Sequence, residues 1–220
     1  MDWDALRLSL WLGGLTVAIL LPLAVAAGRW LAVTRLRARP LIEALLVLPL
    51  VLPPTVVGFV LLVGMAPDSA LGTAWRGLFG GDVVFTFGGI LLASVIVNIP
   101  FAVQPAQRAF EAVGQPLREA AASCGLSPWQ CFVRVELPLA WPGILTGAVL
   151  TFAHTLGEFG VVLMVGGSIP GETRTLALSI YDRVQAFDNA GAARMAGVLI
   201  AVSVIAVALT MLLARRQRHG

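Results

Sequence analysis

The sequence predicts an all-α integral membrane protein with about five transmembrane helices. Of its 220 residues, 58% are hydrophobic and only 12% are charged, and the mean hydropathy is +0.89. Soluble domains carry about 25% charged residues, so this balance excludes a soluble globular protein. A bilayer core requires about 20 consecutive apolar residues per helix, and five stretches approach this length.

The five predicted spans form a single transmembrane domain over residues 1–220. Asp2 and Asp4 precede the first span where a signal peptide would carry positive charge, so we expect a retained helix and no cleaved signal. In chain order the spans are Leu8–Ala27, Leu41–Met65, Gly88–Val103 with flanking residues from Val83, Leu139–Val165, and Met195–Ala214.

Proline residues interrupt the second span. Pro49, Pro53 and Pro54 each lack a backbone N–H and bend or break a helix. Broken backbone is not tolerated against lipid, so this segment is predicted to be covered by protein or to line a water-filled cavity. Ordinary kinks in a packed bundle are the alternative. Three prolines in six residues favour a pathway, with Pro53, Pro54 and Thr55 as candidate pathway residues. The third span repeats the pattern with Asn98, Pro100 and Pro105.

The segment Thr173–Phe187 is apolar but too short and too charged to span. We expect an amphipathic helix at the membrane interface, within a segment of about residues 168–190 outside the membrane. Its apolar residues fall at helical intervals: Leu176, Ile180, Val184 and Phe187.

Arginine placement predicts the topology. Lysine is absent, so arginines alone supply the basic side chains. The connections on one side hold ten, at positions 29, 35, 37, 39, 108, 118, 134, 215, 216 and 218, and the other side holds five, at positions 7, 76, 174, 183 and 194. The richer side should be cytoplasmic, which places the N-terminus outside and the C-terminus inside.

A polar module of about residues 115–138 interrupts the apolar spans on the predicted cytoplasmic side. Pro116 suits the first turn of a helix, and Gly125 suits its C-terminal cap. Ser127, Pro128 and Gln130 then form a capping box that starts a second helix. The pattern predicts two short helices joined by a sharp turn, with Glu119, Ala120 and Ala121 presented for docking.

Glu158 is the carboxylate deepest within a predicted span, and His154 lies one turn earlier on the same face. Ionisable groups in a membrane are costly and indicate function. The pair is a candidate for structural or gating contacts. A membrane-embedded enzyme is the alternative, but the sequence offers no nucleophile or metal-ligand set to accompany the pair.

The sequence indicates no cofactor bound by this chain. Without lysine it can form neither a P-loop nor a Schiff base, and its two cysteines and two histidines show no zinc spacing. We expect Cys124 and Cys131 to be reduced structural thiols. No enzyme activity and no nucleic-acid partner are expected.

The module resembles the EAA motif in permease subunits of binding-protein-dependent ABC importers. Seven positions match: Glu119, Ala120, Ala121, Gly125, Val135, Leu137 and Pro138. Two further stretches extend the resemblance: LPLVLPPTVVGFVLL and TLGEFGVVLMVGGSIPGETRTLALSIY. With these stretches and the EAA motif, the chain is most similar to permeases of molybdate/tungstate importers, which have the type I, MetI-like fold. Sulfate importer permeases share these stretches more weakly.

This resemblance implies partners and roles. The module would be a coupling helix that sits on a cytoplasmic ABC ATPase dimer, and that dimer would bind ATP–Mg. A second copy of the chain would complete the pathway in the bacterial inner membrane, with molybdate or tungstate as cargo. A periplasmic oxyanion-binding protein would dock at the loop that contains Ser168, Pro170, Gly171 and Glu172.

Two other functions remain open at this point. One is a sulfate or thiosulfate ABC importer permease. The other is an ATP-independent channel or secondary transporter, which would need no docking module.

Overall fold

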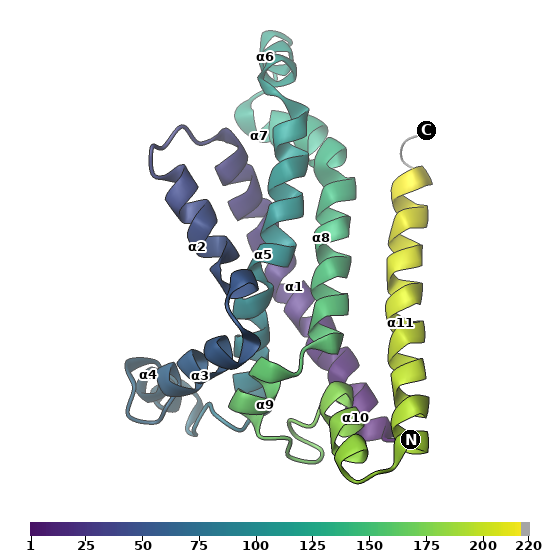
Figure 1. Ribbon diagram of the computed structural model, residues 1–220. Coiled ribbons are helices and arrows are strands. Elements are labelled where there is room, and N and C mark those ends of the chain that lie inside the picture. The colour runs from purple at the N-terminus through teal and green to yellow at the C-terminus, as the bar shows by residue number, and fades with distance from the viewer. Residues whose placement is uncertain (217–220) are drawn as a thin grey trace.

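The computed structural model describes residues 1–216, with side chains up to residue 208. The described chain is helical throughout, with no strand (Figure 1). The elements are α1 (Trp3–Val33), α2 (Arg39–Val51), α3 (Pro54–Gly64), α4 (Ala70–Phe79), α5 (Phe87–Val113), α6 (Gln115–Ser123), α7 (Pro128–Cys131), a π-helical turn η1 (Phe132–Glu136), α8 (Leu137–Gly157), α9 (Gly160–Gly166), α10 (Leu176–Gln185) and α11 (Asn189–Arg216).

Four described helices are long and apolar enough to cross a membrane, and a bent pair can form a fifth span. The four are α1, α5, the continuous helix Pro128–Gly157, and α11 over Asn189–Ala208. The pair is α2 and α3, whose axes differ by 106°. The predicted all-α class and the number of spans are therefore confirmed.

The core lies where α1, α5 and α8 pack together. Glycine lets these helices approach closely, since a Cβ at Gly143 would lie 2.4 Å from the Ala109 Cβ. A Cβ at Gly147 would lie 2.8 Å from the carbonyl oxygen of Ala102. Small residues four apart allow this backbone contact in membranes. The buried cluster around the contact contains Leu20, Ala24, Leu31, Ala102, Val103, Ala106, Phe110, Ala140 and Ile144.

The prolines of the second predicted span break it. Leu52 ends α2 in an extended conformation, and α3 begins at Pro54. Pro49 lies inside α2, and Pro100 and Pro105 lie inside the unbroken α5. The prediction of a bend or break is confirmed at the Pro53–Pro54 pair, where two successive residues lack an N–H.

The fourth predicted span, Leu139–Val165, has the wrong limits. Its helix begins at Pro128, because η1 carries the chain through Pro138 without a break. It ends at Gly157, because Glu158 is extended and its side chain accepts a hydrogen bond from the N–H of Val161. A side chain that replaces a backbone acceptor ends a helix in this way.

Two further helices, α4 and α10, differ from the prediction. Helix α4 was not predicted, although Ser69 caps its start and Gly80 ends it at φ +78°. Helix α10 lies inside the predicted amphipathic segment, and Leu176 is buried as expected. Phe187, however, lies beyond the helix end and is 90% exposed, so the predicted apolar face is shorter than expected.

The two ends of the bundle differ. Helices α6 and α7 lie at one end, and α3, α4, α9 and α10 lie at the other (Figure 1). We call these the α6 end and the α10 end. The described arginines of the predicted richer side fall in α6, in η1, in the α1–α2 connection and in the parts of α1, α2 and α5 toward the α6 end, and those of the poorer side fall in segments toward the α10 end (Figure 1). Of the predicted arginine tail, the side chains of Arg215 and Arg216 and all of Arg218 lie outside the described residues.

Gly143→Ala is expected to destabilise the bundle by about 1–3 kcal/mol, because the new methyl group overlaps Ala109 and the carbonyl of Pro105. The check is the melting temperature of the detergent-purified protein. Gly14→Ala is the matched control, since a Cβ at Gly14 in α1 meets nothing within 4 Å. A Gly143→Ala protein that melts with the wild type would contradict this packing.

Candidate functional site

Helix α6 projects from its end of the bundle as a short helix that is capped at its C-terminal end (Figure 1). The N–H of Leu126 donates to the carbonyl of Ala121, and the N–H of Gly125 donates to that of Ala122. With Gly125 at φ +81°, these bonds form a Schellman motif. The predicted helix and its glycine stop are confirmed.

The docking residues predicted on α6 do not all face outward. Glu119 and Ala120 are exposed, and the Glu119 carboxylate accepts a hydrogen bond of 2.6 Å from Gln115. Ala121 is buried, with 8% of its surface exposed. Of the three predicted docking residues, Glu119 and Ala120 therefore remain accessible on α6.

The second predicted short helix is not a separate element. Its capping box is present, with Ser127 and Gln130 bonded reciprocally. The helix then continues through η1 into α8, so Leu137 and Pro138 lie in the first turn of α8, inside the continuous helix Pro128–Gly157. Pro138 cannot donate to the carbonyl four residues earlier, and the wider π-helical turn, in which Leu137 donates to Phe132, accommodates it.

A buried carboxylate connects α6 to the bundle. Glu136 has a side chain that is 2% exposed and lies between Arg29 of α1 and Arg118 of α6. Arg29 Nε donates to it at 2.5 Å and Arg118 Nε at 2.9 Å. The sequence pattern missed this cluster, because its three members are distant in the chain and Glu136 had no partner within helical spacing.

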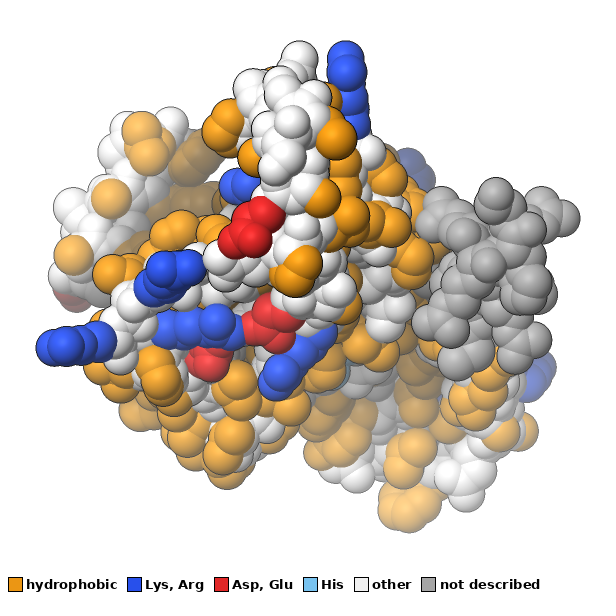
Figure 2. Space-filling model, turned by 90° about the horizontal axis from the view of Figure 1, so that it is seen from above, with side chains coloured by type: hydrophobic (Ala, Val, Ile, Leu, Met, Phe, Trp, Pro, Cys, Tyr) orange, Lys and Arg blue, Asp and Glu red, His pale blue; other side chains and the backbone are white. Residues whose placement is uncertain are grey.

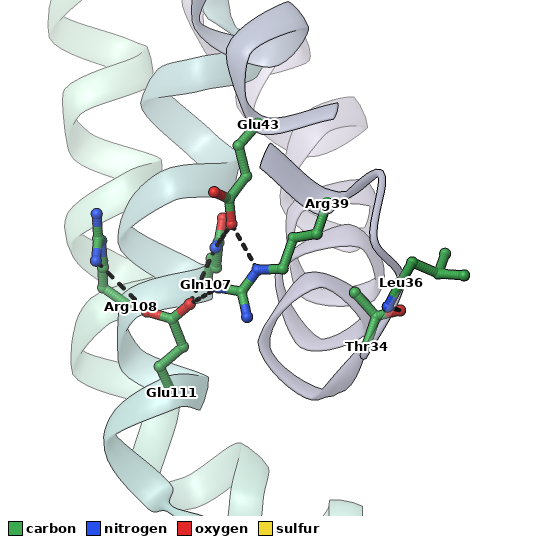
Figure 3. A network of polar contacts seen from close by, with 7 residues as sticks. All are labelled: Thr34, Leu36, Arg39, Glu43, Gln107, Arg108 and Glu111. Carbon is green, nitrogen blue, oxygen red and sulfur yellow. Dashed lines mark hydrogen bonds and ion pairs between the residues drawn. The ribbon is translucent and has the colours of Figure 1, made fainter. Parts of the chain in front are cut away.

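A second charged network ties α2 to α5 at the same end (Figure 3). Arg39 donates to Glu43 at 2.7 Å and also bonds Glu111. Gln107 donates to both carboxylates, and Arg108 lies 3.6 Å from Glu111. No described residue of α2 is fully buried, and this network links α2 to the bundle together with the half-buried Ile42 and Leu46, which pack on the core. Seen from the α6 end, charged side chains gather together with hydrophobic ones around them (Figure 2).

The two breaks in the spans meet at the other end of α2. A Cβ at Gly160 would lie 2.8 Å from the Cβ of Pro54 and 3.7 Å from the N of Thr55. The start of α3 therefore packs against the start of α9. The structure brings Pro54 and Thr55 close to the break beside Glu158, and Pro53, Pro54 and Thr55 are exposed in the single chain.

The predicted pair His154–Glu158 forms one part of a polar chain. The two side chains are 3.7 Å apart, and His154 Nδ1 lies 3.1 Å from the side-chain amide oxygen Oδ1 of Asn98. Phe101 stacks on the imidazole at 4.1 Å. Glu158 is 7% exposed and stabilises the first turn of α9. The pair therefore links α5, the end of α8 and the start of α9.

Internal hydrogen bonds hold the loop at Ser168–Glu172 in place. Thr173 donates to the carbonyl of Gly166 at 2.6 Å and accepts from the N–H of Ile169 at 2.8 Å. Ser168 bonds Asp182, whereas Pro170, Gly171 and Glu172 are exposed. Gly171 and Glu172 line a cavity of about 510 Å³ together with Asp4, Arg7 and Trp11 near the start of α1.

Comparison with known proteins agrees with this arrangement. Residues 18–219 match the family described as the binding-protein-dependent transport system inner membrane component. The chain belongs to this family. As such a permease, it is a multi-pass protein of the inner membrane.

Two molybdenum transport permeases match the chain over its whole length, and a sulfate permease matches part of it. It is 47% identical to the molybdenum transport system permease protein ModB of Azotobacter vinelandii over 219 residues, covering 100% of this chain and 96% of the relative. It is 37% identical to ModB of Escherichia coli K12, covering 100% and 97%. The sulfate transport system permease protein CysT of the same organism is 36% identical over 171 residues, covering 78% and 61%.

A solved structure shares the fold. The permease superposes with a TM-score of 0.78 on a chain of a bacterial alginate ABC transporter, solved in complex with an alginate-bound periplasmic protein. The match covers 97% of this chain and 78% of the other, at 17% sequence identity. The expected importer-permease fold is confirmed by this likeness.

Glu158→Ala is expected to destabilise the permease by about 1–3 kcal/mol, because it leaves the N–H of Val161 buried without an acceptor. Glu158→Gln retains a carbonyl oxygen at the same place and should melt closer to the wild type. Thermal unfolding of the three purified proteins checks the order. Equal melting temperatures for Glu158→Ala and the wild type would show that the α9 cap contributes nothing.

Proposed function

We propose that this permease forms the membrane pathway of an ATP-driven molybdate importer. The observation that carries the proposal is the 47% identity to a molybdenum transport permease over the full chain. The sulfate permease of E. coli matches only 78% of the chain, so sulfate or thiosulfate is the second candidate cargo. Tungstate has the same tetrahedral dianionic shape as molybdate and is an expected alternative substrate.

The proposed assembly contains two copies of the permease, a cytoplasmic ABC ATPase dimer and a periplasmic oxyanion-binding protein. The α6 end would face the cytoplasm, as its arginines favour, and the N-terminus would lie outside. Glu119 and Ala120 would contact the ATPase, with Gly125, Leu137 and Pro138 shaping the module. Pro170, Gly171 and Glu172 would lie where the binding protein docks.

The proposed cycle uses chemistry that resides in the partner. The ATPase would bind and hydrolyse ATP–Mg, and the permease itself would be neither an enzyme nor a cofactor carrier. ATP binding would draw the two α6 helices together and open the pathway to the outside. Hydrolysis and release would return it to the inward-open state. The nucleotide would select between the outward-open and inward-open states because it binds more tightly to one of them than to the other.

Within the pathway, the meeting point of the α2/α3 and α8/α9 breaks is the proposed gate. Glu158 would repel a tetrahedral dianion, and its carboxylate already accepts the N–H of Val161. We therefore assign it and His154 to holding the gate, not to cargo contact. Cargo selection would rest mainly with the binding protein.

Reconstituted complex is expected to accumulate radiolabelled molybdate only with the loaded binding protein outside and ATP inside. Unlabelled tungstate should reduce molybdate uptake more strongly than sulfate does, because the binding protein that delivers the cargo would select between these oxyanions. Liposomes with a non-hydrolysable ATP analogue are the control. Accumulation without ATP would establish the channel or secondary-transporter alternative, and stronger competition by sulfate would establish the second cargo.

In Glu119→Lys, the stimulation of ATP hydrolysis by loaded binding protein is expected to fall at least about fivefold. This is the lower end of the usual range for coupling between two sites. The fall is expected because the change reverses charge on the exposed face of α6. Asp68→Lys makes the same change at an exposed site in the α3–α4 connection and is the matched control. Unchanged stimulation in Glu119→Lys would remove this residue from the docking surface.

A further inference from the structure

We infer that Glu136 is a positioning residue that joins the coupling helix to two transmembrane helices. This inference rests on the proposed function and adds to it the path by which α6 moves the bundle. Three elements meet at the Glu136 carboxylate: α1 through Arg29, α6 through Arg118, and its own helix η1–α8. Arg118 also contacts α5, through the carbonyl of Phe110.

Arg118 makes two different contacts with one guanidinium. Its Nε donates to Glu136 at 2.9 Å, and its Nη2 donates to the carbonyl of Phe110 at 2.7 Å. Phe110 lies in the last turn of α5, where carbonyl groups lack partners within the helix. Gly114, four residues on, donates to Glu111 instead. Arg118 thus completes the end of α5 while it holds Glu136.

Arg29 brings α1 into the same contact. Its guanidinium donates to both Glu136 oxygens, at 2.5 and 3.4 Å, and lies 5.0 Å from the centre of the Phe132 ring. The planar fork of arginine suits both the carboxylate and the aromatic face. Two arginines facing one carboxylate would repel each other without it.

The turn η1 accounts for the inward position of Glu136. A π-helical turn contains one residue more than an α-helical turn, and this one lies where Pro138 removes a donor. Such turns commonly place a functional side chain. The neighbours Val133 and Arg134 are exposed, whereas Glu136 is 1% exposed.

These contacts attach α6 to the bundle through side chains, in addition to its two connections along the chain. Along the chain, α6 is joined to α5 through Gly114 and to α7 through Gly125, both at positive φ. Because glycine permits many backbone conformations, these joints alone transmit motion poorly. The Glu136 carboxylate with its two arginines is a second connection, and it makes α6, α1 and α8 move together.

The test is Glu136→Gln in the permease–ATPase complex, reconstituted with the binding protein. Basal ATP hydrolysis and the yield of complex are expected to stay near wild type, because the exposed surface of α6 is unchanged. Uptake per ATP hydrolysed should fall at least about tenfold, within the range for loss of one coupling interaction. Glu136→Asp keeps the charge and should restore much of the ratio.

Asp82→Asn is the matched control. It also neutralises a carboxylate that is paired with an arginine, but its partner Arg76 belongs to α4, away from α6 and its attachments. Its uptake per ATP should match the wild type. A wild-type ratio in Glu136→Gln would overturn the inference, even if the complex were less stable, since a purely structural role changes stability alone.

A second variant decides the matter if Glu136→Gln does not assemble. Arg118→Lys keeps the positive charge but cannot hold Glu136 and the Phe110 carbonyl with a planar fork. It should lower uptake per ATP, and a wild-type ratio would again overturn the inference. If the wild-type complex itself shows no uptake, the proposed function fails instead, so the two failures are distinguishable.

Discussion

Backbone hydrogen bonding in a water-free bilayer is the constraint on which this fold depends. Each helix end that lies within the membrane needs a protein partner for its N–H and carbonyl groups. The permease has two such interruptions, after Leu52 and at Glu158. It places them against each other, with Pro54 packed on Gly160 and the Glu158 carboxylate bonded to Val161. The two interruptions thus contact each other, while Pro53, Pro54 and Thr55 remain exposed in the single chain.

The same constraint separates the bundle into rigid and adjustable parts. The contact of α1, α5 and α8 is close and rich in small residues, so these helices form a single body. Helix α2 has no fully buried residue among those described, and it meets the core through the half-buried Ile42 and Leu46 and through charged side chains near its start. These contacts are less extensive than the glycine-lined interface, so α2 is held less firmly than α1, α5 and α8.

Much of this organisation follows from local sequence rules. The number of spans, the Pro53–Pro54 break, the cap at Gly125 and the Ser127–Gln130 box depend on neighbours within a few residues, and the structure confirms them. The break at Glu158 was missed because the surrounding residues are apolar, although Gly157 and Gly160 flank it. Glu136 was missed because its partner Arg29 lies 107 residues away. Contacts of this kind depend on the packing of whole helices, which spacing does not encode.

The uninterrupted course of the chain through Pro138 has a mechanical consequence. From the Ser127 cap to Gly157 the permease is one helix of 30 residues, or about 45 Å at 1.5 Å per residue. The helix includes the η1 turn and Pro142, but its backbone first leaves the helical conformation at the extended residue Glu158. A tilt of this long helix at the α6 end would therefore displace its far end sideways, close to where the two broken spans touch.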